Sequence, residues 1–224
     1  KRLIALDAQL QEVVGRYIDG DLQGARERCR DLVKRRPSMA ISWLHLAHLE
    51  RASGDLAAGI EALQKAVALT PDDETAVSLL GAYLAEAGRP QEAVAWLETP
   101  AARDDADPQL LVAYGLALAK LGRHEEAIVP FDRALAQDAS NARLLVERGT
   151  AHMMAGRRDR ARHDFEAAIA RHPGAARAHT SLGVLACDGG NVADATAHWR
   201  RAVEIDAGVV MIGHEPHRAG FGVV

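Results

Sequence analysis

The sequence predicts an all-α protein built as a solenoid, and three observations support this. Six glycines recur every 34 residues without a slip. Apolar residues recur at helical spacing on both sides of each glycine, and columns of small residues repeat in phase with them. A fixed period of this length is typical of proteins that stack copies of one small supersecondary unit. We therefore expect six helical hairpins, at residues 6–39, 40–73, 74–107, 108–141, 142–175 and 176–209.

The second unit, 40–73, shows the pattern most clearly. Trp43, Leu46 and Leu49 define an apolar face of a first helix, and a second helical pattern follows after Gly54. Gly54 lies where the first helix ends, because a helix C-terminus commonly needs a left-handed residue that glycine adopts without strain. Pro71 stands just beyond the second helix, where its missing N–H costs little.

Small and bulky residues form separate columns through the repeats. Small side chains at facing positions let two antiparallel helices approach closely, and bulky side chains are expected to wedge between neighbouring units. The small residues of the first helices are Ala47, Gly81, Gly115, Gly149 and Gly183, and those of the second helices are Ala25, Gly59, Ala93, Ala127, Ala161 and Ala195. The bulky residues are Cys29, Leu63, Leu97, Phe131, Phe165 and Trp199.

This pattern resembles the tetratricopeptide repeat (TPR) family, with six units in tandem. The Trp43-x2-Leu46-Ala47 run, the repeated glycine, the alanine and aromatic columns and the closing proline all match the family signature. The resemblance covers residues 6–209 without insertions between units. It implies a right-handed superhelix of helical hairpins whose first helices line a concave inner surface.

Four residues depart from the repeat pattern. Val13 replaces the usual small residue of the first unit, and Arg148 occupies a normally apolar position of the fifth. Pro100 predicts that the second helix of the third unit ends near Thr99, with either an early stop or a hinge at 101–108. Pro130 is expected to bend its helix without ending it.

The segment 210–224 does not continue the repeats. Its glycines and its proline predict a non-helical tail, although tandem repeats usually finish with an additional covering helix. Three explanations remain open for this end of the solenoid. The tail folds back over Trp199 and Val203, it begins a further domain, or the last apolar face self-associates.

Composition restricts the classes of partner and the cellular compartment that we expect for this protein. The chain has 224 residues, 48% of them hydrophobic, and a net charge of −4, which argues against nucleic acid as a general partner. No apolar run is long enough to span a membrane. Two cysteines at opposite ends of a solenoid predict no intramolecular disulfide and mildly favour a reducing compartment. We expect a cytoplasmic location, with the periplasm as an open alternative, and the Ala- and Arg-rich usage favours a bacterial origin.

The sequence shows no pattern that predicts catalysis, a cofactor or a metal. There is no phosphate-binding loop, nucleophile elbow or Cys-x-x-Cys pair. His45 and His48 are spaced i, i+3 on one helix, but no third or fourth ligand accompanies them, as a structural zinc would need. The His214-Glu215-Pro216-His217 segment is typical of a His-rich tail. We therefore expect a non-enzymatic protein without cofactor or metal.

The family geometry implies a groove lined by one face of each first helix. The groove would be apolar at its N-terminal end, shallow in the middle and edged by arginines near its C-terminal end. The alternative is that these periodic apolar residues seal the joints between adjacent helices. The candidate lining residues are Leu10, Val14, Tyr17, Leu44, His48, Arg51, Ser78, Ala82, Val112, Leu116, Arg143, Val146, Met153 and Arg177.

These observations predict an adaptor or scaffold that binds other proteins. The groove would hold a peptide or helix with apolar anchors, and an acidic group of that ligand would lie near Arg143 or Arg177. Two alternatives stay open. The chain is a regulatory or targeting module of a larger enzyme or secretion-assembly protein, or it self-assembles through its uncapped C-terminal end.

Overall fold

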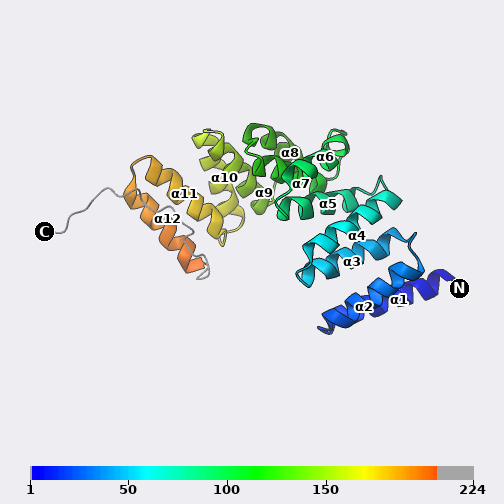
Figure 1. Ribbon diagram of the computed structural model, residues 1–224. Helices are drawn as coiled ribbons and strands as arrows, with labels where there is room; N and C mark the ends of the chain where they lie inside the picture. The colour runs from blue at the N-terminus through cyan, green and yellow to red at the C-terminus, as the bar shows by residue number, and fades with distance from the viewer. Residues whose placement is uncertain (1, 206–224) are drawn as a thin grey trace. The chain divides into compact units, whose positions relative to one another are not determined.

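The computed structural model describes the backbone of residues 2–205 and the side chains from Ala8 onward. Within that range the chain forms α-helices joined into successive antiparallel hairpins (Figure 1). The predicted all-α class and the predicted pairing of helices are confirmed. The helices are α1 (Arg2–Ile18), α2 (Leu22–Arg35), α3 (Ala40–Ala52), α4 (Leu56–Leu69), α5 (Glu74–Glu86), α6 (Pro90–Ala101), α7 (Pro108–Lys120), α8 (His124–Gln137), α9 (Ala142–Met154), α10 (Arg158–Arg171), α11 (Ala176–Asp188) and α12 (Val192–Ile205).

The helices fall into two compact units. The N-terminal unit, residues 1–139, contains α1 to α8, and the C-terminal unit begins at Ser140 and contains α9 to α12. In both units the two helices of each hairpin pack closely on one another. The boundary lies between the fourth and fifth hairpins and not at Pro100, the position at which the sequence had suggested a hinge.

The periodic glycines end the first helices as predicted. All six have positive φ, between 74° and 87°. At Gly54 the left-handed turn lets the N–H of Asp55 donate to the carbonyl oxygen of Glu50 at 2.9 Å, which closes the helix end. A side chain in this conformation would strain the backbone, so the repeat needs glycine here.

Acidic and amide side chains cap the starts of three first helices, again 34 residues apart. The carboxylates of Asp73 and Asp107 accept backbone N–H groups at the starts of α5 and α7, and the amide oxygen of Asn141 does the same for α9. Each cap satisfies an N–H that would otherwise lack a partner in the helix. The repeat period therefore extends to the helix caps.

The small and bulky columns meet inside each hairpin rather than between hairpins. A Cβ added at Gly115 would lie 2.5 Å from the ring of Phe131, and one at Gly149 would lie 2.7 Å from the ring of Phe165. Gly81 with Leu97, and Gly183 with Trp199, show the same arrangement. The prediction that the bulky residues wedge between neighbouring units was therefore incomplete, because Leu97, Phe131, Phe165 and Trp199 each cover the glycine of their own hairpin.

The structure differs from the prediction at Pro100 and agrees with the prediction at Pro130. Helix α6 ends at Ala101 and not near Thr99, so Pro100 lies inside its last turn. The helix continues because proline lacks only its own N–H, and the N–H of Ala102 still donates to the carbonyl oxygen of Glu98. Helix α8 continues past Pro130 to Gln137, as predicted.

Two buried acidic groups are paired with arginines. Glu50, only 2% exposed, accepts hydrogen bonds from Arg26 at 2.7 Å and from Arg30 at 2.7 and 3.0 Å. Asp164, also 2% exposed, accepts two hydrogen bonds from Arg148, at 2.9 and 2.5 Å. This pair explains the charged residue at a normally apolar position of the fifth hairpin, since Arg148 neutralises a buried carboxylate.

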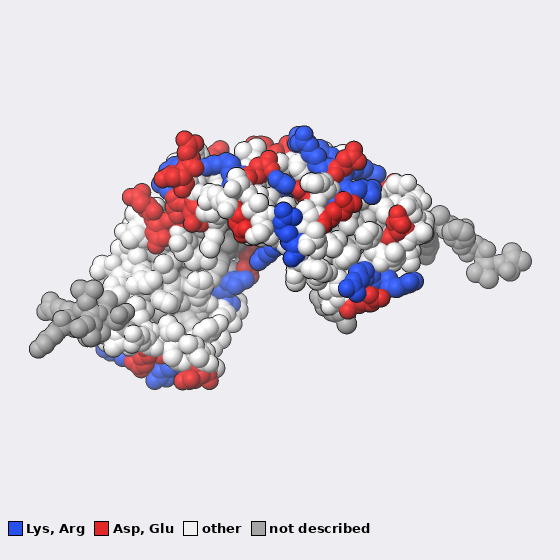
Figure 2. Space-filling model, turned by 180° about the vertical axis from the view of Figure 1, so that it is seen from behind, with Lys and Arg blue, Asp and Glu red and all other residues white. Residues whose placement is uncertain are grey.

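Basic and acidic side chains are interspersed on the face shown in Figure 2. Exposed ion pairs such as Arg89 with Glu92 and Arg123 with Glu126 also place basic and acidic side chains next to one another. A phosphate backbone needs a continuous basic surface, and this face does not offer one. The predicted tail, 210–224, lies outside the residues that the structure describes.

Candidate binding groove

A hollow of about 410 Å³ lies between α1 and α3 in the N-terminal unit. Four of the predicted groove residues line it: Val14 and Tyr17 from α1, and His48 and Arg51 from α3. Spacings of three residues place each pair on one helix face. The complete lining is Val13, Val14, Tyr17, His45, His48, Leu49, Arg51 and Ala52.

The hollow exists because its two helices do not pack tightly together. Helices α5 and α7, also first helices of neighbouring hairpins, approach one another closely, whereas α1 and α3 have few close backbone approaches in the described part of the chain. Apolar surface is left open as a result, with Val14 37% exposed and Tyr17 51% exposed. Apolar side chains that neighbouring helices leave uncovered are candidates for contact with a partner.

The α3 side of the hollow is held by contacts to the next hairpin. The Nδ1 atom of His48 lies 3.0 Å from the hydroxyl oxygen of Tyr83 on α5. The guanidinium carbon of Arg51 lies 5.3 Å from the centre of the Tyr83 ring, and its Nε donates to Glu86 at 2.8 Å. These contacts orient both side chains before any ligand arrives.

Electrostatics make the hollow nearly neutral. Desolvation lowers the pKa of His45, and desolvation together with nearby His45 and Arg51 lowers the pKa of His48. Both imidazoles are therefore neutral at pH 7. Among the lining side chains only Arg51 carries a charge at that pH, and Glu86 partly offsets it. The hollow suits an apolar or aromatic side chain with a polar group at its edge.

The remaining predicted groove residues of this unit differ in exposure. Leu10, Leu44, Val112 and Leu116 are half-buried, and Ala82 is exposed. Ser78 is only 8% exposed, so its placement in an open groove was wrong. Helix α5 packs closely against α7, but of the two predicted groove residues on α5 only Ser78 is buried.

The predicted groove residues of the C-terminal unit also differ in exposure. Arg143 is exposed and Met153 is half-buried. Val146 is only 4% exposed, so it belongs to the core and does not face a groove. Arg177 is exposed but already bonded, since its guanidinium donates to Glu147 at 2.6 Å.

The sequence analysis did not assign Tyr83 or Glu86 to the groove. Both lie on α5 and fix the side chains that line the hollow. A signal was present, because His48 and Tyr83, like Arg51 and Glu86, are 35 residues apart. Residues separated by about one period lie on neighbouring first helices, so this spacing indicates cross-hairpin contacts.

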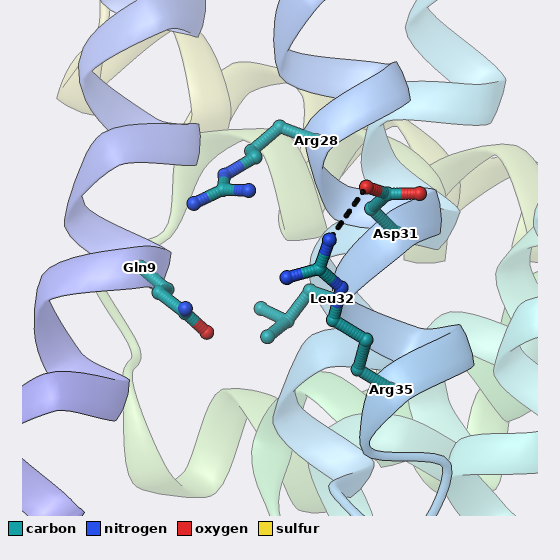
Figure 3. A pocket seen from close by; sticks show the side chains of 5 residues that line it. All are labelled: Gln9, Arg28, Asp31, Leu32 and Arg35. Atoms are coloured by element: carbon teal, nitrogen blue, oxygen red, sulfur yellow. Dashed lines mark hydrogen bonds and ion pairs between the residues drawn. The ribbon is translucent and has the colours of Figure 1, made fainter.

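A second depression between α1 and α2 is too small for a peptide. It has about 10 Å³ of free volume and is lined by Gln9, Arg28, Asp31, Leu32 and Arg35 (Figure 3). Arg35 donates to Asp31 at 3.5 Å, as the dashed line shows. A space of this size holds about one water molecule.

Two further searches covered the described residues. No three His, Cys, Asp or Glu side chains come together among them in a way that would hold a metal ion. No helix in the same range has the length and apolar character needed to cross a membrane.

The chain belongs to the tetratricopeptide repeat family. Two profiles of that family match, one over residues 27–163 and one over 146–209, and together they span most of the described helices. Both describe repeats rather than an enzyme. No curated protein matches the sequence.

Solved structures of other proteins share the fold. The type IV pilus biogenesis factor PilW is 20% identical, with a TM-score of 0.78 over 88% of this chain and 92% of its own. PilF of Pseudomonas aeruginosa is 18% identical, with a TM-score of 0.74 over 92% and 94%. YrrB, a TPR protein with an unusual peptide-binding site, is 21% identical, with a TM-score of 0.61 over 81% and 93%.

Proposed function

We propose that this chain is a non-enzymatic adaptor that binds a peptide or helix of a partner protein, with the hollow between α1 and α3 as its principal contact. The hollow carries the proposal. Its volume of about 410 Å³ lies within the range of roughly 300–1,000 Å³ typical of ligand sites. TPR domains bind proteins and peptides, and the peptide-binding site described for YrrB supports the same class of function here.

The chemistry of the lining favours one kind of anchor. Val14 and Ala52 offer apolar surface, while Tyr17 and His48 offer ring faces with polar tips. A large apolar or aromatic side chain of the partner would bury this surface and gain about 25 cal/mol per Å². Arg51 would attract a carbonyl or carboxylate beside that anchor.

The acidic group of the ligand, expected near Arg143 or Arg177, stays part of the proposal. Arg143 is the better candidate of the two. A carboxylate that bound Arg177 would have to displace Glu147, whereas Arg143 is exposed at the start of α9.

The test uses the two exposed residues of α1. Peptides selected from a random library on the wild-type chain are measured against V14E and Y17E. Both side chains are more than a third exposed, so these variants should fold. We expect each to weaken binding at least about tenfold, because a buried charge opposes an apolar anchor.

Val129→Glu is the matched control. Val129 is 60% exposed on α8, a second helix, and does not line the hollow. Peptides that bind V14E and Y17E as tightly as the wild type would overturn the proposal. An equal loss of peptide binding in V129E would also overturn the proposal. The same assay with L44E and L116E tests whether the half-buried positions also contact the ligand.

One observation favours the second candidate, a module of a secretion-assembly system. The likeness to PilW and PilF spans about nine-tenths of this chain and of both neighbours. At 18–20% identity it supports only the shared fold, so function needs its own test. Expression of this chain in a bacterium that lacks PilW should restore type IV pilus biogenesis if this candidate holds. If pili are not restored, this candidate function is wrong.

Self-association is the third candidate, and exposed apolar residues on the last described helix favour it. Val192 is 67% exposed and Val203 is 46% exposed on α12. Light scattering of residues 1–224 and of a 1–209 truncation should show an oligomer if this end self-associates. Monomers in both samples would dismiss it.

A further inference from the structure

Two histidines face each other in the sixth hairpin. His179 lies on α11 and His198 on α12, and their Nδ1 atoms are 3.2 Å apart. The ring centres are 5.5 Å apart and the ring planes are inclined by 39°. Both side chains are half-buried, so solvent reaches the pair. At this distance one Nδ1–H donates to the other Nδ1 in the absence of another ligand.

The fold does not itself require imidazoles at these two positions. One period earlier the equivalent residues are Leu145 and Asp164, and two periods earlier they are Leu111 and Pro130. Leu145 and Leu111 are 5% and 0% exposed, so an apolar core residue serves this position in the fifth and fourth hairpins. The paired histidines are therefore particular to the sixth hairpin.

The first hairpin shows the same positions with different side chains. Gln9 and Arg28 lie five periods before His179 and His198, and Figure 3 shows them on facing helices at the outer seam of the hairpin. Side chains at these two positions thus come from both helices toward one small depression. In the sixth hairpin that geometry brings two metal-binding side chains together.

We propose that His179 and His198 form a two-ligand site for a divalent transition-metal ion of the zinc and copper class. Two imidazole nitrogens bound to one tetrahedral ion at 2.0–2.1 Å are about 3.3–3.4 Å apart. The observed 3.2 Å is close to that value, and each ring must turn by about 35° so that its Nδ1 lone pair points to an ion beside the line between the two nitrogens. Imidazole is a preferred ligand of these ions.

At neutral pH the two histidines can bind an ion after one proton changes its position on one ring. The proton that one Nδ1 carries in the hydrogen bond moves to Nε2 of the same ring through solvent, so both Nδ1 lone pairs face the ion. The remaining positions on the ion are filled by water or by groups of a partner.

Nearby charge limits the affinity. Arg201 lies three residues after His198 on α12, and it pairs with Glu204 at 3.1 Å. A cation beside a dication weakens binding. Replacing Arg201 by Gln should therefore tighten binding, which gives the proposal a variant that gains function.

The experiment titrates the untagged 224-residue chain with Zn²⁺ in a calorimeter and with Cu²⁺ under electron paramagnetic resonance. We expect one ion per chain and nitrogen hyperfine splitting from two ligands. H179L, which introduces the leucine of the fourth and fifth hairpins, and H198Q should each weaken binding at least about tenfold, since losing even an outer partner of a ligand costs that much. R201Q should bind more tightly.

Two double variants serve as controls for the other histidines. H45Q/H48Q removes the spaced pair on α3, and H214A/H217A removes the pair in the C-terminal segment. Both should bind as the wild type does, and circular dichroism melting checks that every variant folds. Unchanged affinity in H179L and H198Q would overturn the proposal. Loss in either control, or an R201Q affinity no better than wild type, would also overturn it.

Discussion

The Nδ1 atom of His48 lies 3.0 Å from the hydroxyl oxygen of Tyr83, and this hydrogen bond joins two neighbouring hairpins. The same tyrosine ring lies beneath the guanidinium of Arg51, which pairs with Glu86. Tyr83 is only 4% exposed, although two side chains that line the candidate groove depend on it. The groove is therefore supported by a residue that lies outside it.

Removing the Tyr83 hydroxyl should weaken this junction. We expect Y83F to lower the free energy of unfolding by about 0.5–1.5 kcal/mol, the usual net contribution of one hydrogen bond. Urea unfolding of Y83F, H48A and the double variant measures this loss of stability. In the H48A background, Y83F should cost much less, because the partner is already absent. Equal costs in both backgrounds would contradict the assigned bond.

The buried Glu50 should be needed for folding stability. It is 2% exposed and bonded to both Arg26 and Arg30, so E50A leaves two guanidiniums without their carboxylate. We expect a loss of about 3 kcal/mol in urea unfolding. Glu61 on α4 is exposed and provides the control, with E61A expected to change little. A cost for E50A similar to that of E61A would show that the pairing contributes nothing.

Two glycine-to-alanine changes should have opposite signs. A methyl at Gly115 would lie 2.5 Å from the Phe131 ring, so G115A should destabilise by about 1–3 kcal/mol. Gly15 lies within α1 with no atom within 4 Å of an added Cβ, so G15A should stabilise by up to about 1 kcal/mol. Thermal melting distinguishes them. The close-packing account fails if G115A is neutral.

The two cysteines should react at very different rates. Cys29 is fully buried, its Sγ donates to the Ser42 carbonyl oxygen at 3.4 Å, and burial together with Glu50 raises its pKa to about 12. Cys187 is exposed. A thiol reagent at pH 8 should label one site quickly, because the thiolate is the reactive form. C187S should abolish the fast phase, and a fast phase that persists in C187S would show that Cys29 is accessible.

Stability should fall as the pH drops below neutral. The pKa values of His45, His48 and His179 are lowered in the fold, so the unfolded chain binds more protons over this range. Their contribution is complete above the unfolded pKa of about 6.5 and is lost as the pH falls toward the folded values. Melting temperatures from pH 7.5 to 5 should decline, and less steeply in H45Q/H48Q. An unaltered slope in that variant would assign the decline to other groups.

The period of the sequence predicted the fold because a repeat leaves few local choices. Each left-handed glycine, each small residue facing a bulky one and each proline past a second helix depends on positions within one hairpin. Such local requirements can be read from spacing alone. The four predicted residues that line the hollow came instead from the resemblance to the tetratricopeptide repeat family, which implies the helix face that lines a groove.

Only the tertiary structure decided which of those faces stays open. Leu10 and Val146 occupy equivalent positions in their hairpins, yet Leu10 is half-buried and Val146 is only 4% exposed. The difference in exposure depends on how closely neighbouring first helices pack. That packing in turn depends on many side-chain contacts between hairpins. The roles of Tyr83 and Arg148 have the same origin, because each is defined by a partner on another helix. Spacing along the chain determines which residues share a helix face, but the distance between helices determines what that face can bind.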